Sequence, residues 1–235
     1  MPEATEFSSA AGSVELIDQT DSAGAEADLQ RGLDLLSEVQ RGVRGRTLRL
    51  YRPEPTMAFG QRDANLPGFP AAAAAARAHG FEPLVRKAGG RAAPYHRGCL
   101  VVDHLEPEAD AVLQAKSRFS RFAELFAGVL RQVGVEAGIG EIPGEYCPGE
   151  FSVHGSGNGL RLKLVGTAQR VVAGAWLFSS VIVVEDGDPL REVLVDCYRE
   201  LGLAWDPTTA GAAADLRPEL RVEQVKAALL AGYGR

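Results

Sequence analysis

Residues 161–170 read Arg-Leu-Lys-Leu-Val-Gly-Thr-Ala-Gln-Arg, and the rest of the chain is best interpreted outward from them. Polar and apolar side chains alternate through residues 161–165, which predicts a strand with one face toward a core. Lys163 then points away from Leu162 and Leu164. The small residues that follow, Gly166 to Ala168, leave room beside Lys163 for an extended ligand. A lysine in this position is commonly a solvated strand residue, so its role depends on its neighbours.

A cysteine lies upstream, in Glu-Tyr-Cys-Pro-Gly-Glu-Phe at residues 145–151. Pro148 and Gly149 favour a turn directly after Cys147, which places its thiol where a substrate can reach it. A thiolate is a strong nucleophile, and a cation such as Lys163 favours the thiolate over the thiol. Free cysteines are more commonly small buried packing residues, so the interpretation as a nucleophile depends on this local context.

The third informative segment, residues 85–98, carries the paired glycines Gly89 and Gly90 among several cations. Glycines let backbone N–H groups approach a ligand closely, and a nearby cation such as Arg86 suits an anionic group. His96 is a candidate proton acceptor in the same segment, and a surface or capping role for it stays open. Two glycines alone indicate a turn more commonly than a ligand site.

Composition narrows the class of protein. The chain has 235 residues, of which 46% are hydrophobic, and this suits one large domain with a substantial core. The net charge of −6 gives no general basic field for nucleic acid. No apolar run is long enough to span a membrane, and the polar start does not resemble a signal peptide. The three scattered cysteines fit neither a disulfide framework nor a zinc site. We expect a soluble, reduced, cytoplasmic protein without a metal.

Hydrophobic periodicity predicts strands interspersed with helices. Residues 1–20 are expected to be an irregular, flexible segment, and residues 21–235 a single catalytic domain. Helices are predicted from residue 21 to a stop at Gly42 and at residues 71–76, 117–133, 189–201 and 222–231. Strands are predicted at residues 47–51, 56–59, 82–86, 92–95, 99–105, 135–139, 151–153, 161–165, 169–172 and 176–184. Because many strands follow one another as in hairpins, the predicted fold class is α/β (α+β), a mixed, largely antiparallel sheet with packed helices.

The three segments, in this order, resemble the biotin/lipoate protein ligase superfamily, most closely its cysteine-dependent octanoyltransferase and amidotransferase branch. Members carry an Arg-x-x-Gly-Gly loop, matched here by Arg86, Gly89 and Gly90. They carry a Lys-x-x-Gly-x-(Ala/Ser)-Gln element, matched by Lys163, Gly166, Ala168 and Gln169. The amidotransferases have Tyr-Cys-Pro-Gly, which residues 146–149 match as they stand. The resemblance extends over about residues 25 to 205.

The resemblance implies the sheet shared by biotinyl ligases and class II tRNA synthetases. It implies an enzyme of protein lipoylation that moves an octanoyl or lipoyl group onto Cys147 as a thioester and then onto the lysine of a lipoyl domain. The implied partners are glycine cleavage H protein, the E2 subunit of 2-oxoacid dehydrogenases and, as a further donor, acyl carrier protein; no cofactor is implied. Cys147 and Lys163 are implied to be catalytic, and substrate contacts are expected from Arg86, Gly89, Gly90, His96, Gly166, Thr167 and Ala168.

The sequence also departs from the ATP-dependent lipoate ligases of this superfamily. Those enzymes carry a triple glycine and a His-Asp pair in the first loop, where this chain has Arg91 as the third residue and Arg97 after His96. The departures favour acyl transfer over adenylate chemistry. Two alternatives stay open: an ATP-dependent lipoate–protein ligase, and a non-catalytic binder of lipoyl domains or acyl groups. Cys99, in an apolar strand, and Cys197, in a helix, are assigned to packing.

Overall fold

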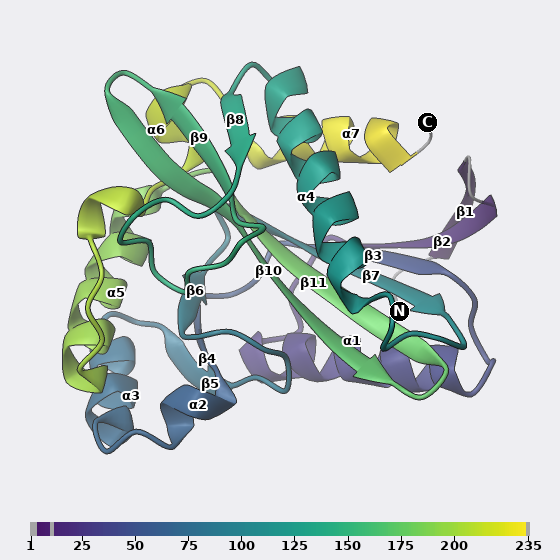
Figure 1. The fold of residues 1–235 in the computed structure, drawn as a ribbon, viewed down its shortest axis with the longest axis horizontal. Helices are drawn as coiled ribbons and strands as arrows, with labels where there is room; N and C mark the ends of the chain where they lie inside the picture. The colour runs from purple at the N-terminus through teal and green to yellow at the C-terminus, as the bar shows by residue number, and fades with distance from the viewer. Residues whose placement is uncertain (1–3, 10–11, 234–235) are drawn as a thin grey trace.

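The computed structural model describes residues 4–9 and 12–233. Its centre is an eight-stranded sheet (Figure 1). The strand order is β1 (Ala4–Ser9), β2 (Gly12–Gln19), β3 (Thr47–Tyr51), β7 (Cys99–Pro107), β11 (Ala175–Val183), β10 (Leu160–Val172), β9 (Val153–Gly157) and β8 (Glu136–Ile139). A smaller sheet has the order β5 (Glu82–Val85), β4 (Thr56–Phe59) and β6 (Ala93–Tyr95).

Most neighbouring strands run antiparallel. The pairs β2–β3 and β4–β5 are parallel, and the other paired strands are antiparallel. The helices are α1 (Ala25–Gln40), α2 (Gln61–Ala64), α3 (Phe69–Ala78), α4 (Ala115–Gln132), α5 (Gly187–Leu201), α6 (Ala213–Leu216) and α7 (Val222–Tyr233), with a short 3₁₀ helix at Pro207–Thr209. This arrangement confirms the predicted mixed, largely antiparallel sheet with packed helices.

Helices cover both faces of the large sheet (Figure 1). Side chains of a strand alternate between its two faces. Leu48, Val102 and Phe178 point to one face, where they join buried side chains of α4 and α7 in one apolar core. Leu105 and Leu177 point to the other face and pack against α1. The smaller sheet packs with α3 and α5 in a separate core.

Several local predictions are confirmed. The strands at Thr47–Tyr51 and Thr56–Phe59 have the predicted bounds. The helix predicted at residues 117–133 is α4, and it buries Phe122, Phe126 and Val129, which recur at helical spacing. Gly202 ends α5 in a left-handed conformation with φ of +67°, which glycine adopts without steric cost.

The prediction that residues 1–20 form an irregular segment is wrong for most of that stretch. Residues 4–9 and 12–19 are strands of the large sheet, and β2 pairs in parallel with β3. Val14 and Ile17 of β2 are buried on opposite faces of the large sheet. Local β-propensity here is weak, because Ser, Gly, Glu and Asp interrupt the pattern; the strand forms through its tertiary pairing with β3.

Residues 160–172 form one continuous strand, where the sequence predicted two strands separated by small residues. The reason is the partner strand. β11 pairs with β10 without interruption from Val165 to Val172, so Gly166 and Thr167 stay in the ladder despite their low burial. Within the described part of the chain, no helix is long and apolar enough to cross a membrane.

Candidate active site

Three segments far apart in the sequence meet at one cavity of about 540 Å³. The cavity lies at an uncovered edge of β10. The pairing of β9 with β10 stops at Val165, and β10 continues past this residue without β9 beside it. Its lining includes most of the predicted site residues, namely Arg86, Gly90, Cys147, Lys163, Gly166 and Thr167. The structure therefore places the predicted nucleophile, the lysine and part of the glycine loop in one space.

Cys147 lies on a turn that its surroundings hold in place. Its φ of +44° is a left-handed conformation that non-glycine residues rarely adopt, at a cost on the order of 1–3 kcal/mol. Its backbone N–H donates to the hydroxyl of Tyr198 at 3.0 Å, and that hydroxyl donates to the carbonyl of Ala92 at 3.0 Å. Burial raises the pKa of Tyr198, so the hydroxyl keeps the proton that it donates.

The glycine loop lies directly against the thiol. The N–H of Arg91 donates to Sγ of Cys147 at 3.1 Å. Gly90 has φ of +98°, and a Cβ at this position would lie 2.6 Å from Nη2 of Arg86 and 3.1 Å from Sγ. Only glycine fits this approach. The backbone N–H of Arg91 therefore lies beside the sulfur, and the loop can approach it this closely because residue 90 has no side chain.

Lys163 is almost fully buried, with 2% of its side chain exposed. Its Nζ donates to Oε1 of Glu145 at 3.0 Å and to the carbonyls of Tyr146 at 2.9 Å and Cys147 at 2.5 Å. An ammonium has three hydrogens, and these three acceptors occupy them. Lys163 thus holds the peptide groups on both sides of Cys147. A hydrogen bond from Lys163 to an acyl oxygen would require one of these partners to be replaced.

Glu145 is a functional residue to which sequence reasoning gave no role. Its carboxylate is buried and accepts from Lys163, the hydroxyl of Ser152, the N–H of Gly149 and the N–H of Ile142. These contacts fix the loop on both sides of Cys147. The position of Glu145 two residues before Cys147 could have indicated this role, because a buried lysine needs an acidic counter-charge nearby.

Asp63 was also missed. It is fully buried, its Oδ2 accepts from the N–H of Gly60 at 2.9 Å, and its Oδ1 accepts from Nη1 of Arg91 at 3.0 Å. Arg91 replaces the third glycine of the ligase pattern, and both its side chain and its backbone N–H make hydrogen bonds at the site. Its side chain is bound to Asp63 while its backbone N–H is directed at Cys147.

A second cavity, of about 330 Å³, continues from the first. The two share Arg86, Gly166, Thr167 and Val181 as lining residues. Ala168, expected at the substrate site, lines this second cavity and not the first. Its walls are largely apolar and include Leu29, Leu33, Leu84, Val101 and Leu177.

Two predicted contact residues lie outside both cavities. The Nδ1 of His96 accepts from the N–H of Gly98 at 2.9 Å, so its Nε2 carries the proton and donates to the carbonyl of Asp186 at 2.9 Å. His96 therefore orders a neighbouring turn and does not face Cys147. Gly89 is exposed, and an added Cβ there would meet nothing within 4 Å.

The other two cysteines behave as packing residues. Cys99 and Cys197 are buried, and burial raises the pKa of each thiol to about 12. Both thiols therefore stay protonated at neutral pH. Cys147 differs from them because it is half-buried and lines a cavity. Over residues 4–9 and 12–233, no group of three or more His, Cys, Asp or Glu side chains is placed to hold a metal ion.

Comparison with known proteins identifies the family of the chain. The family model of the lipoyl protein ligase A/B catalytic domain matches residues 28–233. The "Octanoyl-[GcvH]:protein N-octanoyltransferase" of Geobacillus kaustophilus is 28% identical over 174 residues, which cover 74% of this chain and 60% of that protein. The "Lipoyl-[GcvH]:protein N-lipoyltransferase" of Listeria monocytogenes is 23% identical over 180 residues, which cover 72% of this chain and 63% of that protein. The chain thus spans about three-fifths of the length of these curated relatives.

Solved structures share the fold. A crystal structure of lipoate-protein ligase A bound with ATP has a TM-score of 0.70 at 19% identity, covering 94% of this chain and 83% of that one. A bi-partite lipoate protein ligase from Thermoplasma acidophilum has a TM-score of 0.64 at 18% identity, covering 93% and 81%. The family model covers most of the chain, and the chain belongs to the lipoyl protein ligase A/B catalytic domain family.

Proposed function

We propose that this protein transfers an octanoyl or lipoyl group through a thioester on Cys147 to the lysine amine of a lipoyl domain. The observation that carries the proposal is the position of the Cys147 thiol, which lines the cavity and accepts the N–H of Arg91. The names of the relatives, which refer to octanoyl and lipoyl transfer from GcvH, support this chemistry.

In the first half-reaction, the thiolate attacks the carbonyl carbon of an acylated lysine. The C–N bond breaks, the leaving amine takes up the proton that the thiol gave up, and the acyl group stays on sulfur as a thioester. The N–H of Arg91, which donates to Sγ, positions the sulfur before the attack. We favour an acylated H protein over acyl carrier protein as the donor, because residues 146–149 resemble the amidotransferase branch most.

In the second half-reaction, a neutral lysine amine of the recipient domain, such as an E2 lipoyl domain, attacks the thioester. The C–S bond breaks, and the proton that the amine loses returns to the sulfur of Cys147. Negative charge develops on the acyl oxygen in both steps, and each donor placed there is worth on the order of 3 kcal/mol. We propose that backbone N–H groups on the edge of β10 past Val165 are these donors, since β9 does not pair with that edge there. Gly166 and Thr167 lie on this edge and line the cavity.

The second cavity is the proposed site for the acyl chain. It continues from the Cys147 cavity and is lined mainly by apolar side chains. Each buried methylene contributes about 0.8 kcal/mol, so even part of an eight-carbon chain gains several kcal/mol there.

The test starts from octanoylated H protein and an unmodified E2 lipoyl domain, with transfer followed by intact mass. We expect the wild type and Cys197→Ala to transfer the group and Cys147→Ala to lose transfer while keeping its fold, as judged by circular dichroism. A parallel reaction with free octanoate and MgATP tests for a ligase. Efficient modification in that reaction, unaffected by Cys147→Ala, would favour the ligase instead. Binding of the lipoyl domain without any transfer would favour a non-catalytic binder.

A further inference from the structure

A single row of residues interrupts the apolar floor of the second cavity. Register across the strands places Tyr51, Val101, Val181 and Gly166 opposite one another on β3, β7, β11 and β10. Two residues along each strand, on the same face, the next row is Arg49, Asp103, Ser179 and Ala168. Rows on one face are roughly 7 Å apart. The first row borders the Cys147 cavity. The second cavity begins at this row, and the next row that it reaches along the strands is the polar one.

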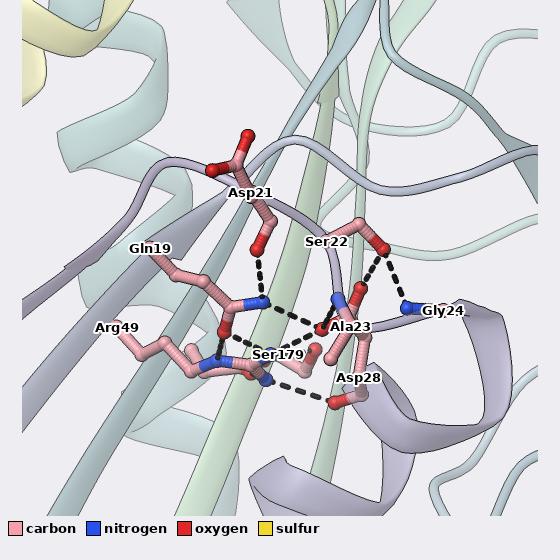
Figure 2. Close-up of polar contacts among 9 residues, drawn as sticks. Gln19, Asp21, Ser22, Ala23, Gly24, Asp28, Arg49 and Ser179 are labelled. Carbon is pink, nitrogen blue, oxygen red and sulfur yellow. Dashed lines mark hydrogen bonds and ion pairs between the residues drawn. The ribbon is translucent and has the colours of Figure 1, made fainter. Parts of the chain in front are cut away.

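The polar row belongs to a buried ionic cluster, part of which Figure 2 shows. Arg49 is fully buried, and its guanidinium donates to Oδ1 of Asp28 at 3.0 Å and to Oδ2 of Asp103 at 3.1 Å. It also donates to Gln19 and to the carbonyl of Asp28. Ser179 donates to Oδ1 of Asp103 at 2.7 Å.

The cluster holds two carboxylates for one guanidinium. Arg49 already has Asp28 as its counter-charge, so Asp103 is the carboxylate in excess. Burial raises the pKa of Asp103, with the nearby Asp28 acting in the same direction. Its surroundings thus already disfavour the charged form, and covering it with hydrocarbon would raise this cost.

The cavity stays open above this carboxylate because α1 has a glycine there. A Cβ on Gly32 would lie 3.4 Å from Oδ2 of Asp103 and 3.6 Å from Cδ2 of Leu177. Asp28, Gly32, Asp103, Leu177 and Ser179 all line the second cavity. A glycine inside a helix costs about 1 kcal/mol relative to alanine, and here it leaves the polar row accessible from the cavity.

We propose that Asp103 and Ser179 are specificity-determining residues that form a polar end to the acyl cavity and limit how long an apolar acyl chain can be. This inference rests on the proposed function, in which the second cavity holds the chain. A chain that stops over Val101 and Val181 meets only apolar side chains. Each further methylene has to lie against the Asp103 carboxylate and gains no hydrophobic stabilisation there.

The experiment measures transfer from H protein that carries octanoyl, decanoyl or dodecanoyl on its lipoyl lysine. Asp103→Val removes the carboxylate and keeps a branched side chain that suits a strand. It is expected to raise the decanoyl-to-octanoyl rate ratio about tenfold, the worth of two buried methylenes. Ser179→Ala is expected to raise the ratio by a smaller factor. The matched control is Ser180→Ala, since Ser180 is a buried neighbour on the same strand that does not line either cavity.

A structural role for Asp103 would lower all rates together and leave the ratio unchanged. A ratio equal to that of the wild type in folded Asp103→Val and in Ser179→Ala would overturn the inference, with octanoyl transfer by the wild type still upholding the proposed function. If Asp103→Val does not fold, the ratio in Ser179→Ala against Ser180→Ala decides alone. Failure of the wild type to transfer any of the three groups would remove the proposed function and the inference with it.

Discussion

Two buried ionic groups lie on the same sheet and differ in how their charges balance. At the Cys147 end, one lysine faces one glutamate, and backbone carbonyls take the remaining ammonium hydrogens. Over the second cavity, one arginine faces two aspartates. A balanced pair whose hydrogen bonds all go to one loop fixes geometry. A cluster with an excess carboxylate at a cavity wall is suited to recognition, and neutralising that carboxylate, Asp103, costs less than neutralising either member of the balanced pair.

The largest difference is expected for the balanced pair. Glu145→Gln or Lys163→Met leaves one charge buried without its partner, which costs about 3–5 kcal/mol in unfolding free energy. Urea unfolding measures the loss. The double variant should recover much of the stability, because removing both charges of a buried pair is close to neutral. Transfer should stay low in it, because the bonds to the Tyr146 and Cys147 carbonyls are gone. A single variant within about 1 kcal/mol of the wild type would contradict the assigned role.

The second largest effect is expected in the glycine loop, which also lies at the Cys147 end of the sheet. Gly90→Ala imposes a left-handed backbone on a residue with a side chain and pushes against Arg86 and Sγ of Cys147. We expect a cost of about 1–3 kcal/mol and at least about a tenfold loss of transfer. Gly89→Ala is the matched control, since its Cβ meets open space. Equal rates of transfer in the two variants would show that the loop does not approach the thiol as described.

Tyr198→Phe removes one hydroxyl that holds the Cys147 turn. The N–H of Cys147 and the carbonyl of Ala92 both lose their partner. We expect stability to fall by about 1–2 kcal/mol and transfer by about tenfold. Single-turnover kinetics locate the loss. A positioning role predicts a slower acylation step with little change in KM, whereas an unchanged acylation rate would limit Tyr198 to a packing role.

The smallest effect is expected at the cluster with excess charge. Asp103→Asn should change stability at neutral pH by no more than about 1 kcal/mol, because the amide can accept from Arg49 and donate to Ser179. Because the pKa of Asp103 is raised in the folded state, the wild type loses stability as pH rises from the unfolded pKa through the folded one. The variant lacks this loss. Its stability relative to the wild type should therefore increase between acid and neutral pH, and a constant difference in urea midpoints would contradict the direction.

The parts of the site that lie within short sequence segments could be predicted from the sequence alone. Turn residues after Cys147, alternation around Lys163 and the paired glycines predicted three segments that do meet at one cavity. Tyr198 could not be found in this way. It lies on α5, far along the chain from Cys147, and only the packing of α5 brings its hydroxyl to the turn.

Arg49 and Asp103 were hidden for a different reason. Arg49 lies between two leucines, and Asp103 lies with His104 in an otherwise apolar strand, so neither position carries a local signal for a shared cluster. Their relationship comes from the register of three strands, which places Arg49, Asp103 and Ser179 in one row. His96 shows the reverse error, because a histidine close to the glycine loop in sequence points to Asp186 in space.

The proposed mechanism depends on an acyl-enzyme at Cys147. It is tested by incubation of the wild type with octanoylated H protein alone, followed by intact mass and peptide mapping. We expect one octanoyl adduct on Cys147, released when an unmodified lipoyl domain is added, and no adduct on Cys147→Ala. Transfer by Cys147→Ala at the rate of the wild type, or turnover of the wild type with the label on another residue, would contradict it.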